Sequence, residues 1–499
     1  MYAQQIGDME GTEGPSIITG AYSGLGARKE GAFVFFRVYA PYADEVFLVG
    51  SFNGWGETHR MKKDRAGVWE TSLGKKEVSD GDGYKYKIYK NGQAVYLTDP
   101  CSVETDGEHY HNSVYRNIEF LSREKFNEKN NSEKDFSLIK SVYKFRVDGW
   151  LPATNSRQVD YERLADEILP YVLQMGYTHV DISGLFEEYY DFTENRSVRA
   201  PFALKGGREK IASLCNFVRL MHKASIGVLI DWCADESIGG YDADLAFYTE
   251  NALYWLDNFE IDGLVIGSFE CGTEFLRQLV HSVKRERKNA CIIAESGEDA
   301  TMLGFDGCVE RSDGYLGIFK GMDSPEEEIC AKASAATCLL FEKGRMLTEA
   351  GFETGREQSA GSPFDYEALS NVNNMRFQLF CSELNYAYLS DADIGECRKN
   401  ANIVSVCERD GMRIVRRQTE GGELVIVCDL LGDGGEYRIN DGGEWRMIFD
   451  SNAILGIGGG ALLHSACGET GLRLSPYGSV LLKKNFDNKY TLKRRCFHV

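Results

Sequence analysis

The stretch YERLADEILPYVLQMGYTHVDIS, residues 161–183, decides the fold. Its first two-thirds repeat apolar residues at the spacing of an amphipathic helix, and its last third is a short run with the composition of a strand. The segment SVYKFRV, residues 141–147, precedes it and has a strand composition as well. The sequence therefore predicts a strand–helix–strand unit over residues 141–183.

The same alternation of strand and helix continues along the chain for about 200 residues. Repeated βα units favour a parallel sheet with buried strands, and this many units indicate a closed barrel. In such a barrel the chemistry belongs at the C-terminal ends of the strands. The further predicted strands are GVLIDW (227–232), GLVIGSF (263–269), CIIAES (291–296) and GRMLTEA (344–350), with helices at 208–224, 249–259, 273–286 and 326–342 and a short segment GFDGCVERSD at 304–313.

The two ends of the chain have a different pattern. The first 120 residues contain short strands such as FVFFRVY (33–39), broken by Asn-Gly turns. A polar boundary stretch, EKFNEKNNSEKD, follows at 124–135, and beyond Ile403 the strands become antiparallel again. We expect a multidomain α/β and all-β protein. Its predicted parts are an N-terminal β-sandwich over 1–123, a central TIM-type (β/α)8 barrel over 137–400 and a C-terminal antiparallel β-sandwich over 401–499.

Composition narrows the possible ligands. The formal charge of −20 disfavours nucleic acid and anionic membranes, whereas a neutral polymer is indifferent to it. No stretch approaches the roughly 20 apolar residues of a membrane span, and the N-terminus MYAQQIGDMEGTEG has no signal-peptide pattern. The 14 cysteines form no CxxC pair. We therefore expect a cytoplasmic protein with reduced cysteines, and no cofactor or metal is implied.

Several segments resemble a known family. LGARKEGAFVFFRVYAPYADEVFLVGSFNGW, residues 25–55, looks like carbohydrate-binding module family 48. The barrel is similar to glycoside hydrolase family 13, specifically to the glycogen (1,4-α-glucan) branching enzymes. The matching segments are YERLADEILPYVLQMGYTHVDI, IGVLIDW, NALYWLDNFEIDGL and IIAES in order, then SPYGSVLL near the end. This resemblance covers nearly the whole chain and implies an α-glucan ligand.

The resemblance does not extend to the catalytic nucleophile. Family members cleave an α-1,4 bond with an aspartate nucleophile and a glutamate acid/base, and then transfer the chain to a 6-hydroxyl. Their fourth strand ends in the pattern DGLRVDAV, but residues 262–269 read DGLVIGSF. Gly267 stands at the nucleophile position and Val265 at the arginine position, and glycine has no atom that can attack a sugar. Glu270 lies about 10 Å further along a strand, too far to substitute.

The other family positions are partly kept. The pattern DWVPxHF becomes DWCADES here, so Asp231 persists while Glu236 replaces a histidine. Asp231 has two open interpretations, substrate binding or the holding of local loops. Glu295 stands at the acid/base position, where it is either a catalytic residue or a hydrogen-bond anchor without a partner carboxylate.

The third family carboxylate follows a histidine, in SHDE. Its nearest counterpart is Asp313, in Ser312-Asp313-Gly314. The stretch between strands five and seven is shortened here, which leaves open whether all eight βα units are present.

The N-terminal module keeps more of its family's pattern. Trp55 follows the turn of SFNGW, where the family places a tryptophan that stacks on sugar, and Lys87 and Asn112 fall near other sugar-contacting positions. Trp55 could equally be a core residue, so both interpretations stay open. Trp69 alternates inward and is expected in the core.

The resemblance and its departures predict a branching-enzyme-like protein of glycogen and α-glucan metabolism that is catalytically inactive and binds α-glucan or a partner protein. Two alternatives remain. One is an active 1,4-α-glucan branching enzyme, and the other is a structural subunit of an active glycogen-metabolising paralogue.

Overall fold

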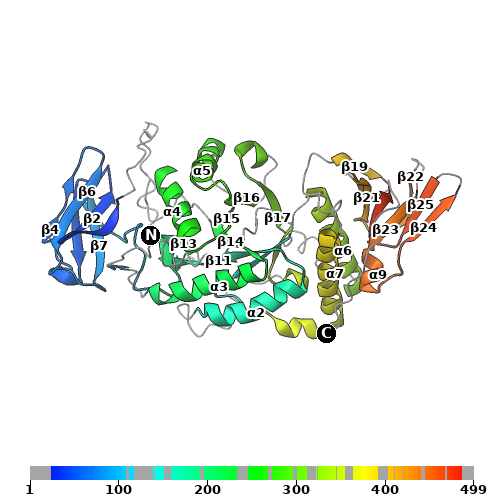
Figure 1. Cartoon of the computed structure of the whole chain (residues 1–499), viewed down its shortest axis with the longest axis horizontal. Helices are drawn as coiled ribbons and strands as arrows, with labels where there is room; N and C mark the ends of the chain where they lie inside the picture. The colour runs from blue at the N-terminus through cyan, green and yellow to red at the C-terminus, as the bar shows by residue number, and fades with distance from the viewer. Residues whose placement is uncertain are drawn as a thin grey trace.

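Three strand-rich parts follow one another along the long axis of the molecule in the computed structural model (Figure 1). The described residues are 24–107, 112–116, 139, 141–150, 159–190, 196–232, 245–267, 272–295, 300–311, 322, 324–343, 346–354, 364–390, 403–409, 411–419, 421–439, 444–466 and 469–485.

The N-terminal part is a sandwich of two antiparallel sheets, as predicted. One sheet has the order β1-β2-β6-β5, and the other has β4-β3-β7-β8 with β9 paired to β7. Alternate residues of β2 point between the sheets, and Trp69 is buried there with its indole N–H donating to Ala40 O at 2.9 Å. The strands are β1 (Gly26–Glu30), β2 (Phe33–Tyr39), β3 (Glu45–Gly50), β4 (His59–Arg60), β5 (Lys62–Lys63), β6 (Val68–Gly74), β7 (Gly83–Lys90), β8 (Gln93–Leu97) and β9 (Ser113–Val114).

The central part is a closed barrel of seven parallel strands over the described residues. The order is β10-β11-β14-β15-β16-β17-β18, and β18 closes the barrel by pairing with β10. Its strands are β10 (Ser141–Arg146), β11 (His179–Ser183), β14 (Gly227–Trp232), β15 (Gly263–Ile266), β16 (Cys291–Glu295), β17 (Gly307–Arg311) and β18 (Met346–Glu349).

The sequence left open whether all eight strands of the barrel are present, and the described residues form seven of them. After the fifth strand, β16, the described chain supplies β17 and β18 before closure, where an eight-strand barrel would have three strands. This part of the barrel includes the stretch that is shortened in the sequence.

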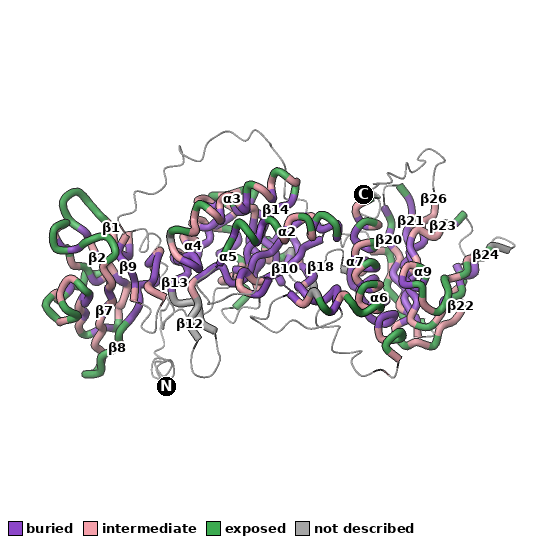
Figure 2. Tube along the Cα trace, turned by 90° about the horizontal axis from the view of Figure 1, so that it is seen from below, coloured by how far each residue is buried: buried purple, intermediate pink, exposed green. Residues whose placement is uncertain are grey.

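Helices surround the barrel and bury their apolar faces against it (Figure 2). Helix α2 begins at Tyr161 after the side chain of Asp160 accepts from Arg163 N, and its buried residues include Leu164, Ile168 and Val172. The helices of this part are α2 (Tyr161–Gln174), α3 (Ile211–Lys223), α4 (Leu245–Asn258), α5 (Thr273–Glu286), α6 (Pro325–Lys343) and α7 (Val372–Ser390), with short 3-10 turns η2 (Arg208–Lys210), η3 (Ala300–Leu303), η5 (Phe352–Thr354) and η6 (Tyr366–Ser370).

One hairpin of this part was not predicted. Strands β12 (Phe186–Tyr190) and β13 (Arg196–Leu204) pair antiparallel outside the barrel. The side chains of Asn251 and Trp255 both donate to Pro201 O, at 3.0 and 2.9 Å, which ties the hairpin to α4.

The C-terminal part contains two antiparallel sheets, with orders β19-β20-β21-β26-β23 and β22-β25-β24. Helix α6 packs against the larger sheet, where Ser334 Oγ donates to Asp429 O at 3.0 Å and Ser479 Oγ donates to Thr337 Oγ1 at 3.0 Å. The elements are β19 (Ile403–Arg409), β20 (Met412–Gln418), β21 (Gly422–Asp429), β22 (Gly435–Ile439), β23 (Trp445–Asp450), α9 (Ser451–Leu455), β24 (Leu462–Ala466), β25 (Glu469–Leu474) and β26 (Ser479–Asn485).

Two other expectations can be compared with the structure. The cysteines within the described residues carry free thiols. Among the described helices, none is both long and apolar enough to cross a bilayer. The predicted domain limits at 123, 137, 400 and 401 stay predictions.

Candidate functional site

The barrel strands place two layers of side chains on the barrel axis. An apolar layer packs as one buried cluster, which includes Val142, Leu229, Val265, Ile293 and Leu347. Residues two positions apart on a strand share a face, so the next layer toward the C-terminal mouth comes from the residues two positions later. That polar layer comprises the charged side chains of Lys144, Asp231, Glu295 and Glu349, and Gly267 occupies the corresponding position after β15.

Lys144 is the centre of this polar layer. Its Nζ lies 3.1 Å from Glu295 Oε2, 3.2 Å from Asp231 Oδ2 and 4.0 Å from Asp181 Oδ2. Burial disfavours the ammonium, but the carboxylates of Asp231, Asp181, Glu295 and Glu349 outweigh that effect and raise the pKa of Lys144. The lysine is therefore a buried cation held by acids from several strands.

Asp181 and Asp231 respond to burial in the opposite way. Desolvation raises the pKa of Asp181 well above its usual range, because the side chain is fully buried and lies among other acids. It also raises the pKa of Asp231, although Lys144 acts against that shift. Over the part of the chain that the structure describes, neither carboxylate oxygen of Asp181 has a hydrogen-bond partner.

Gly267 lies beside Glu295 at the barrel mouth, because the strands that they follow, β15 and β16, are neighbours. A Cβ built on Gly267 would have Glu295 Oε2 at 3.8 Å as its only described neighbour within 4 Å. That is an ordinary van der Waals contact, so the position has room for a small side chain that would point toward the glutamate. Glycine leaves that side of the site without a nucleophilic atom.

A second carboxylate does face Glu295, and the sequence comparison alone did not identify it in this role. Asp231 and Glu295 contact the same ammonium nitrogen, so their facing oxygens lie no farther apart than the sum of those two contacts. Retaining glycosidases place their two carboxyl groups about 5–5.5 Å apart, with the sugar between them. Here the gap between the two acids contains Lys144 Nζ.

Three acids weighed in the sequence lie outside the described residues. They are Glu236, Glu270 and Asp313. The structure instead brings in Lys144, Asp181 and Glu349, none of which the sequence analysis singled out. Each is a charged residue inside a short apolar strand, and that contrast is the signal that could have identified them.

On the N-terminal module, the structure brings Trp55 and Asn112 together over Gly83. A Cβ built on Gly83 would lie 3.7 Å from Trp55 Cζ2 and 3.7 Å from Asn112 Cβ. Trp55 is 39 % exposed, which leaves part of the indole open to solvent.

The backbone at Trp55 is held in an unusual conformation. Its φ is 62°, a left-handed value that costs a non-glycine residue about 1–2 kcal/mol, and its N–H donates to Gly50 O at 2.9 Å. The side chain of Asn53 fixes the same turn through Leu48 O at 3.1 Å and Gly56 O at 2.8 Å. Strain of this kind often marks a functional position.

Lys87 lies four residues beyond Gly83 on the same face of β7, about 13 Å along the strand. It forms an ion pair with Glu57, which also accepts from Tyr89 Oη at 2.7 Å. Hydrogen bonds with Glu57 and Tyr96 raise the pKa of Lys87, and its Nζ lies 5.1 Å from the centre of the Tyr96 ring. Tyr96 is 50 % exposed and was missed in the sequence, although β8 alternates its side chains.

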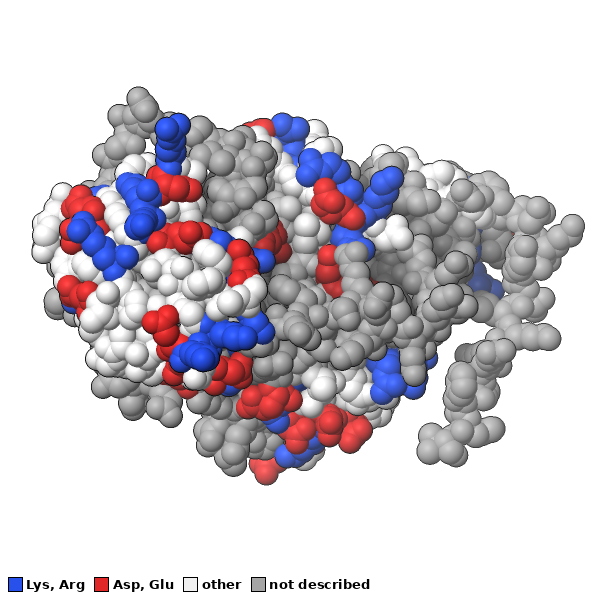
Figure 3. Space-filling model, turned by 60° about the vertical axis from the view of Figure 1, so that its left-hand side comes forward, with Lys and Arg blue, Asp and Glu red and all other residues white. Residues whose placement is uncertain are grey.

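The module therefore presents aromatic rings and polar groups along one sheet face. Aromatic faces with polar groups at their edges suit a neutral sugar chain. Figure 3 shows acidic and basic side chains interleaved over the described surface at this end, without a field of one sign that would select a polyanion.

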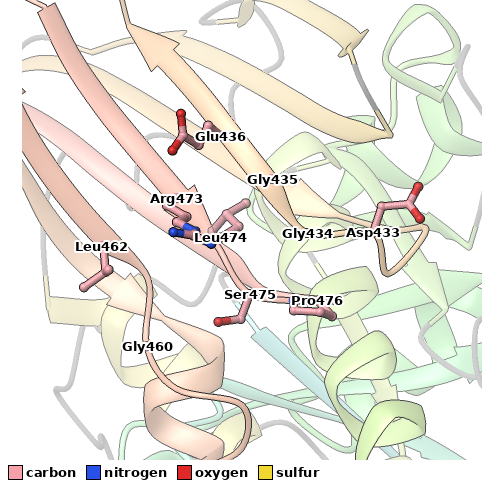
Figure 4. A pocket seen from close by; sticks show the side chains of 10 residues that line it. All are labelled: Asp433, Gly434, Gly435, Glu436, Gly460, Leu462, Arg473, Leu474, Ser475 and Pro476. Atoms are coloured by element: carbon pink, nitrogen blue, oxygen red, sulfur yellow. The ribbon is translucent and has the colours of Figure 1, made fainter.

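A separate hollow of about 510 Å³ lies in the C-terminal part, between β22, β24 and β25 (Figure 4). Its charged lining residues include Glu436 and Arg473, which sit opposite each other in the β22–β25 register. None of the residues predicted for the site lies there.

Comparisons with known proteins agree with this architecture. Residues 24–102 match carbohydrate-binding module 48 (isoamylase N-terminal domain). The 1,4-α-glucan branching enzyme of Desulfitobacterium hafniense (strain Y51) is 28% identical over 264 residues, which cover 46% of this chain and 42% of the relative. That of Geobacillus stearothermophilus is 26% identical over 319 residues, covering 53% and 50%. The chain thus matches about half the length of these relatives.

Solved structures share the fold across more of the chain. Pullulanase from Paenibacillus barengoltzii, in complex with maltohexaose and α-cyclodextrin, has a TM-score of 0.67 at 14% identity and covers 92% of this chain and 95% of its own. The catalytic module of the glycogen-degrading pneumococcal virulence factor SpuA has a TM-score of 0.66 at 13% identity, covering 97% and 99%. The N-terminal module therefore matches carbohydrate-binding module family 48, and the chain resembles 1,4-α-glucan branching enzymes in sequence and pullulanases in fold.

Proposed function

We propose that this protein binds α-glucan through its N-terminal module and does not cleave or transfer it. The observation that carries the proposal is Gly267, which follows β15 directly and lies next to Glu295. Covalent retention needs a carboxylate on each side of the anomeric carbon, and glycine removes one of them. Loss of a covalent nucleophile costs on the order of 10⁴–10⁶ in rate.

Binding is supported by the sheet face that carries Trp55, Lys87, Tyr96 and Asn112. Its rings offer apolar surface for sugar, and the neighbouring side chains offer donors and acceptors. The relatives from Desulfitobacterium hafniense and Geobacillus stearothermophilus bear the name 1,4-α-glucan branching enzyme, and solved pullulanases of the same fold hold maltohexaose or maltotetraose. We infer glycogen or a starch-like glucan as the ligand, and the cytoplasm as its place of action.

The alternative is an active 1,4-α-glucan branching enzyme in which Asp231 takes the nucleophile's place. The contact of Asp231 and Glu295 with one nitrogen favours it, because the two acids are close enough to flank a sugar ring. Lys144 argues against this alternative, because its ammonium contacts both acids where the sugar would have to bind.

Co-sedimentation with glycogen tests the binding proposal. Trp55→Ala should weaken binding about 10-fold or more, because the exposed part of the indole offers an apolar ring face to a sugar. Phe33→Ala is the matched control, since Phe33 is an aromatic residue, 51 % exposed, on the other sheet of the sandwich. A native chain that sediments no better than albumin would remove the glucan proposal.

Iodine staining of amylose and a reducing-end assay test the absence of catalysis. The native chain should be indistinguishable from Glu295→Gln, because the acid/base glutamate has no partner nucleophile to serve. Activity in the native chain that Glu295→Gln and Asp231→Asn each abolish would establish the active alternative. A bona fide branching enzyme, assayed in parallel, provides the reference activity.

A further inference from the structure

The acids at the barrel mouth are gathered around a cation that the chain itself supplies. Lys144 on β10 reaches Glu295 on β16 and Asp231 on β14 at hydrogen-bond distance, and Asp181 on β11 lies 4.0 Å away. Glu349 on β18 and Arg146 on β10 are the other charged groups that act on this cluster. The lysine side chain is only 10 % exposed.

Such a cluster is stable only as a unit. An isolated buried ammonium or carboxylate is costly, so each side depends on the other for compensation. The acids outnumber the lysine, and Asp181 relies on it most, because neither of its oxygens has a hydrogen-bond partner among the described residues. Removing the cation would leave several carboxylates facing one another.

We infer that Lys144 is an internal cation that bridges Asp231 and Glu295 at the barrel mouth, where a sugar bound against Glu295 would have to lie, and that it blocks the barrel independently of the missing nucleophile. This inference rests on the proposed lack of catalysis, and it names a second cause for it. A site closed in this way would accept a small organic ammonium ion or a protonated iminosugar only after the lysine side chain is removed.

Lys144 is not itself a nucleophile in this setting. Attack on an anomeric carbon requires the neutral amine, whose lone pair forms the bond. The surrounding carboxylates raise the pKa of Lys144, so the group stays protonated near neutral pH. Lys144 therefore occupies the barrel mouth and neutralises the carboxylates around it.

The first test replaces the charge with an apolar chain of similar length. Lys144→Met should lower Tm by about 5 °C or more near pH 8, because the ionised acids lose their counter-ion. Methylammonium and 1-deoxynojirimycin should raise the Tm of this variant, whereas sodium ions and glucose should not. Lys144→Arg keeps the charge and should show neither the loss nor the response to amines.

Asp181→Asn keeps the inference testable if Lys144→Met does not fold. Removing one of the excess acids should leave Tm near pH 8 equal to or above that of the native chain. A Tm for Lys144→Met equal to the native value, no rescue by either amine, or a marked loss of Tm in Asp181→Asn would each overturn the internal-cation role.

The second test restores the nucleophile with α-maltosyl fluoride as substrate. The carboxylate introduced by Gly267→Asp would displace fluoride from the anomeric carbon, and water would then cleave the resulting ester, giving maltose and hydrogen fluoride. We expect fluoride release at least about 10-fold above that of the Gly267→Asn control only when Lys144→Met is combined with Gly267→Asp.

The outcomes separate this inference from the proposed function. Equal fluoride release by Gly267→Asp with and without Lys144→Met, or none in the double variant, would show that Lys144 is not the second block. Either result would leave the inactivity of the native chain standing. Turnover by the native chain would instead refute the proposed function.

Discussion

At the scale of single residues, buried acids are the groups whose behaviour the structure changes most. Asp99 is fully buried in the module, where its carboxylate accepts from Tyr84 Oη at 2.6 Å, Tyr86 Oη at 3.2 Å and Cys101 N at 2.9 Å. Desolvation nevertheless raises the pKa of Asp99 to about 6. The folded state therefore holds this proton more tightly than the unfolded state does.

This raised pKa predicts a pH-dependent stability. The contribution of Asp99 to the free energy of unfolding is greatest below its unfolded pKa of about 3.9. Roughly 3 kcal/mol of that contribution is lost as pH rises through about 6. Asp99→Asn should flatten the dependence of Tm on pH over this range. The exposed Asp166→Asn should retain the native profile, and identical profiles for native chain and Asp99→Asn would contradict the assignment.

The residues at the positions that the family resemblance assigns to catalysis differ in how far their roles depend on neighbouring side chains. Gly267 is informative because of what glycine lacks, and that conclusion needs no neighbours. Asp231 and Glu295 are different, because the same two carboxylates could be catalytic or structural. The ammonium of Lys144 contacts both of them, and this contact is the observation on which our proposal of a structural role rests.

At the scale of secondary-structure elements, helix α6 joins the barrel to the C-terminal sheets. The last turn of α6 contacts Arg417 of β20, which is fully buried. The Nε and Nη2 groups of Arg417 donate to Phe341 O and Glu342 O, each at 2.6 Å. The final carbonyls of a helix have no partner within the helix. The guanidinium supplies one from another part of the chain and favours the negative end of the helix dipole.

Loss of this helix cap should destabilise the fold. Arg417→Met is expected to reduce the free energy of unfolding by about 2–4 kcal/mol, because two buried carbonyls lose charged donors. Urea unfolding followed by circular dichroism measures the change. Arg446→Met removes an exposed arginine of β23 and should cost far less; comparable losses in both variants would contradict the capping role.

At the scale of the whole molecule, the N-terminal module and the C-terminal sheets are attached differently. Arg28 of β1 and Glu250 of α4 form an ion pair at 3.4 Å between module and barrel, with both side chains partly exposed. A pair of this kind contributes at most about 1 kcal/mol. The C-terminal sheets instead share buried polar contacts with α6, including Ser334 Oγ and Thr337 Oγ1.

This difference predicts which part can be separated. Residues 24–116 expressed alone should fold and unfold cooperatively, because both sheets of the sandwich contribute buried apolar residues, among them Val34, Phe36, Val46 and Leu48. A chain that ends at residue 402 should be poorly soluble, since α6 would expose surface that the sheets bury. Thermal unfolding and size-exclusion chromatography measure both. An unfolded module or a stable shortened chain would contradict this division.

Much of this architecture could be predicted from local sequence patterns. The strands at Phe33 and Gly227 and the helices at Tyr161 and Thr273 begin as expected, because period and turn residues act over a few neighbours. The β12–β13 hairpin was missed, because part of its environment comes from Asn251 and Trp255 of a later helix.

The sequence by itself determined the order of strands and helices and the absence of a nucleophilic atom at Gly267, because periodicity and covalent chemistry are local properties. Only the tertiary structure decided that seven described strands close the barrel and that Lys144 lies among Asp181, Asp231 and Glu295. Those residues are 37 to 151 positions away from Lys144 in the chain, and closure of the barrel is what turns their side chains toward one point.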